Sequence, residues 1–130
     1  MNLVSGNLNI IFGWCWINIG FIMGMVMGMK FEKANWLSGY ASWERRMLRL
    51  SHVAFIFLSI LNIVYGHELI NVNLSASWKQ AGSILIIIGA IGIPTVVFTA
   101  AFYKKILYWL AIPIIALTSS TLIMAIGYLK

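Results

Sequence analysis

Charged residues are scarce in this chain. They make up 9% of its 130 residues, against about a quarter of a typical soluble domain. Hydrophobic residues make up 62%, so the composition excludes an ordinary soluble globular domain. Only three residues are acidic, Glu32, Glu44 and Glu68, and none lies inside a long apolar segment. This excludes a pair of intramembrane carboxylates for proton-coupled transport.

Cysteine and histidine are also rare. The single cysteine, Cys15, excludes an intramolecular disulfide. The two histidines, His52 and His67, do not belong to a zinc motif, and the sequence contains no phosphate-binding loop or nucleophile–base pair. We therefore expect no catalysis by this chain alone and no metal site.

Long apolar runs are what the chain has in abundance. A bilayer core about 30 Å thick requires ~20 helical residues. Four segments meet this length: Leu8–Met29, Met47–Gly66, Ala81–Phe102 and Ile106–Tyr128. The sequence predicts an all-α integral membrane protein, with residues 1–130 forming one domain of four transmembrane helices in an up-down bundle.

The basic residues predict the orientation of this bundle. Seven lie in or beside the first and third connections: Lys30, Lys33, Arg45, Arg46, Arg49, Lys104 and Lys105. The opposite side has only Lys79 and Lys130. Because basic loops stay in the cytoplasm, both termini are expected outside. The net charge of +6 then indicates orientation and contact with anionic lipid, not nucleic acid. We expect a multi-pass protein of a bacterial inner membrane.

Aromatic residues mark the first connection. Trp36, Tyr40 and Trp43 recur at i, i+4 and i+7, the spacing of one helix face. With charged neighbours such as Arg46, this pattern indicates a short interfacial segment on the membrane surface. The alternative is an irregular loop whose aromatic side chains anchor at headgroup level.

Small residues predict where helices pack closely. Gly20, Gly24 and Gly28 form a doubled small-xxx-small motif in the first segment, and Gly82 and Gly89 give the third a similar face. Such residues let two backbones approach each other in a membrane.

Polar and proline residues interrupt the apolar segments at specific points. Asn18 lies near mid-membrane, roughly opposite the glycines, and requires a hydrogen-bond partner inside a bundle. This implies a second buried face on the first helix. Pro94 and Pro113 predict kinks in the third and fourth segments, and Pro94 leaves the carbonyl of Ala90 without its helical donor.

The second segment carries a polar stripe. At 100° per residue, its members fall within a sector of roughly 140°: Arg45, Arg49, His52, Ser59 and Asn62. The rest of this helix suits lipid, so the stripe is expected to face protein or a cofactor. An ionisable residue at the depth of His52 is a functional hypothesis by default.

The order of the stripe suits a b-type haem. Imidazole from His52 would bind the iron, and Arg49 and Arg45, nearer to water, would meet the propionates. This helix resembles the haem-binding helices of small membrane cytochrome b subunits. His67, on the same helix, cannot supply the second axial ligand. Two alternatives stay open: a hydrogen bond from His52 to a neighbouring helix, and a quinone or proton-transfer role.

These patterns favour a small non-catalytic subunit of a larger membrane complex, of a respiratory or electron-transfer kind. Its partners would be other membrane subunits and lipids, and His52 would complete a haem b or quinone pocket. The runner-up is a homo-oligomeric transporter or channel whose pathway is lined by Asn18, His52, Asn62 and the hydroxyl groups at 118–121. A third hypothesis is a free-standing monohaem b-type cytochrome.

Overall fold

The computed structural model describes residues 6–129, which form helices and no strand. The elements in chain order are α1 (Asn7–Phe31), η2 (Trp36–Ser38), α2 (Trp43–Glu68), α3 (Ala76–Ala100), η3 (Lys104–Leu110) and α4 (Ala111–Leu129), where η marks a 3₁₀ helix. α1, α2, α3 and the continuous η3–α4 segment are each long and apolar enough to cross a membrane. The prediction of an all-helical protein with four such helices is confirmed.

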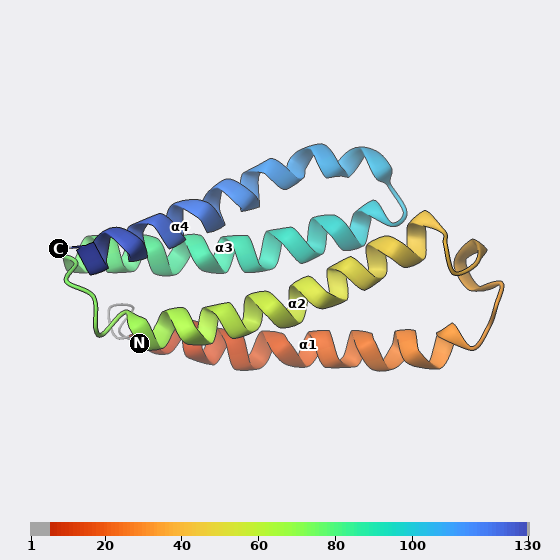
Figure 1. The fold of residues 1–130 in the computed structure, drawn as a ribbon, viewed down its shortest axis with the longest axis horizontal. Coiled ribbons are helices and arrows are strands. Elements are labelled where there is room, and N and C mark those ends of the chain that lie inside the picture. Colours follow the sequence, from red (N-terminus) through yellow and green to blue (C-terminus); the bar gives the residue numbers. More distant parts are fainter. Residues whose placement is uncertain (1–5, 130) are drawn as a thin grey trace.

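The helices lie along the long axis of the molecule, and each connection reverses the chain (Figure 1). Both ends of the described chain and the α2–α3 connection lie at one end of the molecule, and η2 and η3 lie at the other. The main helix contacts are α1 with α2, α3 with α4 and α2 with α3. Helices that follow each other in sequence are therefore also neighbours in space.

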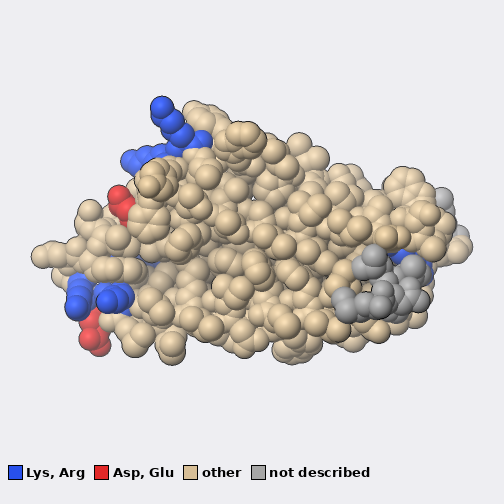
Figure 2. All heavy atoms as spheres, turned by 180° about the vertical axis from the view of Figure 1, so that it is seen from behind, with Lys and Arg blue, Asp and Glu red and all other residues tan. Residues whose placement is uncertain are grey.

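Basic side chains gather at the end that carries η2 and η3, which we call the basic end. Figure 2 shows Lys and Arg clustered there, with a broad uncharged surface over the middle of the molecule. This distribution matches a protein whose middle lies in lipid and whose ends meet water and headgroups.

Two helices begin earlier than the hydropathy pattern predicted. α2 starts at Trp43 instead of Met47, because Ser42 caps it: its hydroxyl accepts a 3.2 Å hydrogen bond from the amide of Arg45. α3 starts at Ala76 instead of Ala81. Hydropathy marks only the lipid-embedded part of a helix, and the backbone continues through the polar interface to its cap.

Pro113 lies in the first turn of α4, shortly after the 3₁₀ helix η3 ends at Leu110. The kink predicted there stays a prediction. The proline ring packs against α3 at Gly92, where a Cβ would come within 2.5 Å of the Pro113 Cβ. Pro113 is thus a packing residue at the α3–α4 interface.

Candidate functional site

His52 lies in the contact between α1 and α2. Its Nδ1 is 2.9 Å from the carbonyl oxygen of Gly20, and its side chain is half-buried. The imidazole packs against Gly24, where an added Cβ would lie 2.6 Å from Cε1 and 3.1 Å from Nε2 of His52. The missing side chain of Gly24 therefore makes the room that the ring occupies.

This packing does not fit a haem. An axial histidine needs its Nε2 directed into a slot wide enough for a porphyrin, whereas the Nε2 edge of His52 faces the α1 backbone at Gly24. His67 is exposed at the last turn of α2 and lies far along the helix from His52. Within residues 6–129, no three His, Cys, Asp or Glu side chains come together as a metal site.

Arg45 points away from His52 and binds the first connection. It is 1% exposed. Its Nε donates to the carbonyl of Trp36 at 2.6 Å, and its Nη2 donates to those of Lys33 at 2.6 Å and Ala34 at 3.2 Å. The guanidinium also lies over the rings of Phe31 and Trp36, at 5.7 and 5.4 Å. The predicted propionate ligand is therefore a structural residue that holds the segment between α1 and α2.

Arg49 and Trp43 make further contacts at the basic end. The guanidinium of Arg49 lies 4.5 Å from the ring centre of Tyr40 and donates a long 3.4 Å hydrogen bond to its carbonyl. The indole of Trp43 donates a 2.7 Å hydrogen bond to Ala100, and Nζ of Lys104 lies 5.4 Å from its ring.

The segment that carries these aromatic residues is not one helix. η2 is a single turn, and Leu37 and Ser38 have positive φ angles of 48° and 61°. Trp36, Tyr40 and Trp43 thus come from a turn-rich connection and the start of α2, as in the loop alternative. Arg46 is exposed beside them.

Ser59 and Asn62 are fully buried and serve the helix contacts. Ser59 donates to the carbonyl of Phe55 at 2.6 Å, and Asn62 donates to that of Leu58 at 2.9 Å. The Oδ1 of Asn62 accepts a 3.2 Å hydrogen bond from Asn9 of α1. The residues of the predicted polar stripe therefore have separate structural roles. Arg45 and Arg49 hold the first connection, His52 lies in the α1–α2 contact, and Asn62 belongs to a buried polar cluster.

That buried polar cluster joins three helices and was missed from the sequence. Asn9 donates to the carbonyl of Ser83 at 3.1 Å as well as to Asn62, and the Ser83 hydroxyl donates back to Asn9. α1, α2 and α3 are thus hydrogen-bonded together near the end opposite the basic end. Asn9 precedes Gly13 by four residues, so its place on the glycine face was the available indication.

The glycines divide into close contacts and one exposed position. Gly20 and Gly24 pack on α2 as predicted, and Gly82 and Gly89 lie against Tyr65 and Leu117. Gly28 has open space within 4 Å of where a Cβ would be, so it makes no such contact within the described chain. Its packing on another subunit stays a prediction.

Asn18 lies on the surface instead of in the bundle. It is exposed near the midpoint of α1, and its amide nitrogen donates 2.7 Å to the carbonyl of Trp14, one turn earlier. Within residues 6–129 it makes no hydrogen bond to another helix. Residues 6–129 therefore do not supply the second buried face that the sequence implied for α1.

The polar residues predicted to line a pathway are dispersed. Thr118 and Thr121 are exposed and bond to carbonyls of their own helix, whereas Ser120 is buried and donates to Gly82 at 2.7 Å. Asn18 is exposed on α1, whereas Asn62 is buried within α2. Within residues 6–129 these side chains do not converge on one pathway through a single chain, and a pathway between copies stays a prediction.

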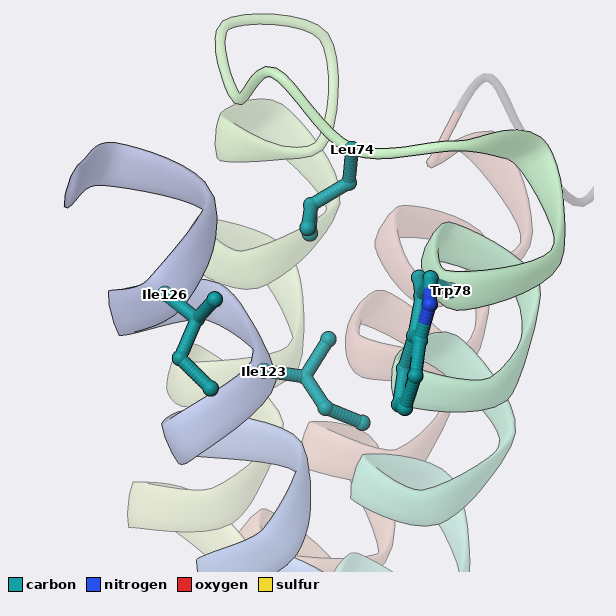
Figure 3. A pocket seen from close by; sticks show the side chains of 4 residues that line it. All are labelled: Leu74, Trp78, Ile123 and Ile126. Carbon is teal, nitrogen blue, oxygen red and sulfur yellow. The ribbon is translucent and has the colours of Figure 1, made fainter. Parts of the chain in front are cut away.

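One hollow near the end opposite the basic end is small and apolar. It measures about 120 Å³ and lies among Leu74, Trp78, Ile123 and Ile126 (Figure 3). These side chains come from the α2–α3 connection, α3 and α4. They offer no group for catalysis.

Comparison of the chain with family models, curated proteins and solved structures finds no match.

Proposed function

We propose that this protein is a small, non-catalytic integral subunit of a larger membrane complex. Support comes from a face of α1 that suits another helix and that residues 6–129 leave uncovered. In the proposed arrangement the chain crosses the membrane up and down four times, with both termini outside. The seven basic residues of the basic end then face the cytoplasm.

The uncovered face of α1 has the spacing of a helix-pairing seam. Its exposed members follow intervals of four and three residues: Ile11, Cys15, Asn18, Ile22, Met25 and Met29. Alternating intervals of this kind fit a left-handed helix pair. The exposed sides of α2 and α3 have the same spacing, so the polar group of Asn18 is what distinguishes this side of α1. Methionine side chains adapt to irregular surfaces, which suits a contact with a different protein.

Asn18 is the observation that carries this proposal. It sits in the middle of the seam and near mid-membrane, where lipid cannot accept or donate hydrogen bonds. The bond to Trp14 uses one amide proton, so the carbonyl oxygen and the second proton still face outward. A polar group on a partner helix would satisfy them, with a gain of about 1 kcal/mol. One asparagine in an apolar seam also fixes the register of the two helices.

The kind of complex stays a prediction from the sequence. A respiratory or electron-transfer assembly in a bacterial inner membrane was suggested by the His52 stripe, which the structure uses for packing. A His52→Ala variant tests the electron-transfer prediction. Loss of a b-type haem band from the isolated complex would show that His52 is a haem ligand. An unchanged band would show that His52 serves helix packing.

The homo-oligomeric alternative uses the same seam. An asparagine is both donor and acceptor, so Asn18 of one copy can pair with Asn18 of another. The partner in that case is a second copy of this chain, and any pathway would run between copies.

Cys15 provides a direct test because it is exposed, lies one turn from Asn18 on the seam and is the only cysteine. A thiol-directed photocrosslinker attached to it in native membranes is expected to join the chain to one other integral membrane protein. A Cys15→Ser/Val53→Cys variant, with its thiol on the exposed side of α2, is the control and should react with lipid alone. A product of twice the chain mass would favour the homo-oligomer, and lipid adducts alone at Cys15 would contradict both.

A further inference from the structure

An open apolar groove runs between α1 and α3 near the basic end, with α2 as its floor. It consists of two hollows of about 370 and 300 Å³ that share Met23 and Phe98. Leu48 and Phe55 of α2 line the bottom. α1 and α3 contact each other far less than either contacts α2, so the space between them is open to the side.

The groove has the length of one membrane leaflet. Its α1 wall is formed by residues at intervals of four and three, including Ile19, Met23 and Val26, and Lys30 follows at the next interval on the same face. Eleven residues separate Ile19 from Lys30, or about 17 Å at 1.5 Å per residue. Half of a hydrocarbon core is ~15 Å.

The deep end of the groove is closed and apolar. The indole of Trp16 donates a 3.0 Å hydrogen bond across to the carbonyl of Ala90, and its ring lies 5.4 Å from that of Phe55. Thr95, in the α3 wall, directs its hydroxyl to the carbonyl of Ile91 at 2.6 Å. The hydroxyl proton of Thr95 is therefore already used within its own helix, and the largely apolar lining suits a hydrocarbon chain.

The mouth of the groove is structured and lies among positive charges. Trp36 and Leu37 line it, and Arg45 holds this turn through the carbonyl of Trp36. Exposed cations stand at both walls: Lys30 continues the α1 wall, and Lys104 follows Phe102 of the α3 wall by two residues. Seven basic and two acidic residues belong to this end, so its net charge favours an anion.

We propose that the groove is a binding site for an anionic phospholipid of the leaflet at the basic end. One acyl chain lies over Leu48 and Phe55 and ends near Trp16. The phosphate lies at the mouth, between Lys30 and Lys104. The length of the groove, its apolar lining and the charge at its mouth all favour this occupant. The groove borders the Asn18 seam, with which it shares Ile22, but its proposed ligand does not depend on Asn18.

Native mass spectrometry of the full-length protein, titrated with phosphatidylglycerol or phosphatidylcholine, tests the site. The wild type should bind phosphatidylglycerol more tightly, and Lys30→Gln should weaken that binding about fivefold, which is the value of one cation near a lipid surface. Val26→Trp, which fills the groove from an exposed position, should abolish the preference. Lys79→Gln and Val53→Trp are matched controls on other surfaces and should bind as the wild type does.

Circular dichroism shows whether a variant that fails to bind lipid is still folded. Val26 and Lys30 are exposed, so their variants should retain full helicity. Equal affinities of the wild type for the two lipids would overturn the proposal. So would phosphatidylglycerol binding that survives Val26→Trp. A bound second copy of the chain that Val26→Trp removes would assign the groove to protein instead of lipid.

Discussion

The indole of Trp16 in α1 donates a 3.0 Å hydrogen bond to the carbonyl of Ala90 in α3. This is the carbonyl that Pro94, four residues later, leaves without a helical donor. The two helices are thus joined where a proline has opened the backbone. In lipid no water would satisfy this carbonyl, so the indole replaces the missing amide.

Replacing the donor tests this relationship. Trp16→Phe should destabilise the protein by about 1 kcal/mol, because the Ala90 carbonyl loses its partner. In a Pro94→Ala background the loss should be smaller, since the new amide of residue 94 can bond to Ala90. Unfolding in mixed detergent and SDS gives the four free energies of this cycle. Additive effects of the two substitutions would contradict the account, and Trp14→Phe, at an exposed position, is the control.

Two glycines of α1 should respond in opposite ways to alanine. A Cβ at Gly13 would lie 2.6 Å from the backbone oxygen of Ser59, which cannot move away cheaply, whereas one at Gly28 meets nothing within 4 Å. We expect Gly13→Ala to lower the free energy of unfolding by about 1–3 kcal/mol. Gly28→Ala should leave it unchanged or raise it by about 1 kcal/mol through helix propensity. Equal effects in the same unfolding assay would show that α1 does not pack on α2 in this register.

Arg45 should be far more important for stability than Arg46. Arg45→Gln removes charge-assisted bonds to three carbonyls and should cost about 2–3 kcal/mol. Arg46→Gln, at an exposed residue, should cost little. Chymotrypsin cleavage between α1 and α2 is an independent measure and should be several-fold faster in Arg45→Gln alone. Equal cleavage of the two variants would mean that Arg45 does not hold this connection.

The orientation predicts which connection reacts with reagents outside the cell. In a Cys15→Ser background, Ala76→Cys should react with a membrane-impermeant maleimide in intact cells, because it lies on the side of the termini. Ala41→Cys, exposed in the first connection, should react only after permeabilisation. The reverse result would mean that the basic end faces outward.

The number of spans and their helical nature could be predicted because lipid allows few alternatives. A segment surrounded by hydrocarbon must satisfy its backbone internally, so an apolar run of sufficient length predicts a helix. A close helix contact at Gly20 and Gly24 was also predictable, since small residues mark close backbone contacts. That the partner is α2 of the same chain could not be predicted, because the motif does not identify the helix that packs on it.

The role of Arg45 could not be predicted by the same reasoning. Its partners are backbone carbonyls of a turn in which Leu37 has a φ of 48°, and no residue pattern marks that conformation. Its helical phase is close to that of His52, which made a shared cofactor plausible, but its long side chain reaches backward to the first connection. For Ala90, the free carbonyl was foreseen and its donor was not, because Trp16 belongs to a distant helix.

The most direct measurement compares the size of the assembly formed by the wild type and by Asn18→Leu in a mild detergent. Size-exclusion chromatography with light scattering should show the wild type bound to a partner, and Asn18→Leu should release a folded monomer. Thr118→Val, another polar-to-apolar change on a lipid-facing surface, should leave the assembly intact. A wild-type protein that extracts as a stable monomer, or an Asn18→Leu assembly of unchanged size, would contradict the proposal that α1 pairs with a partner through Asn18.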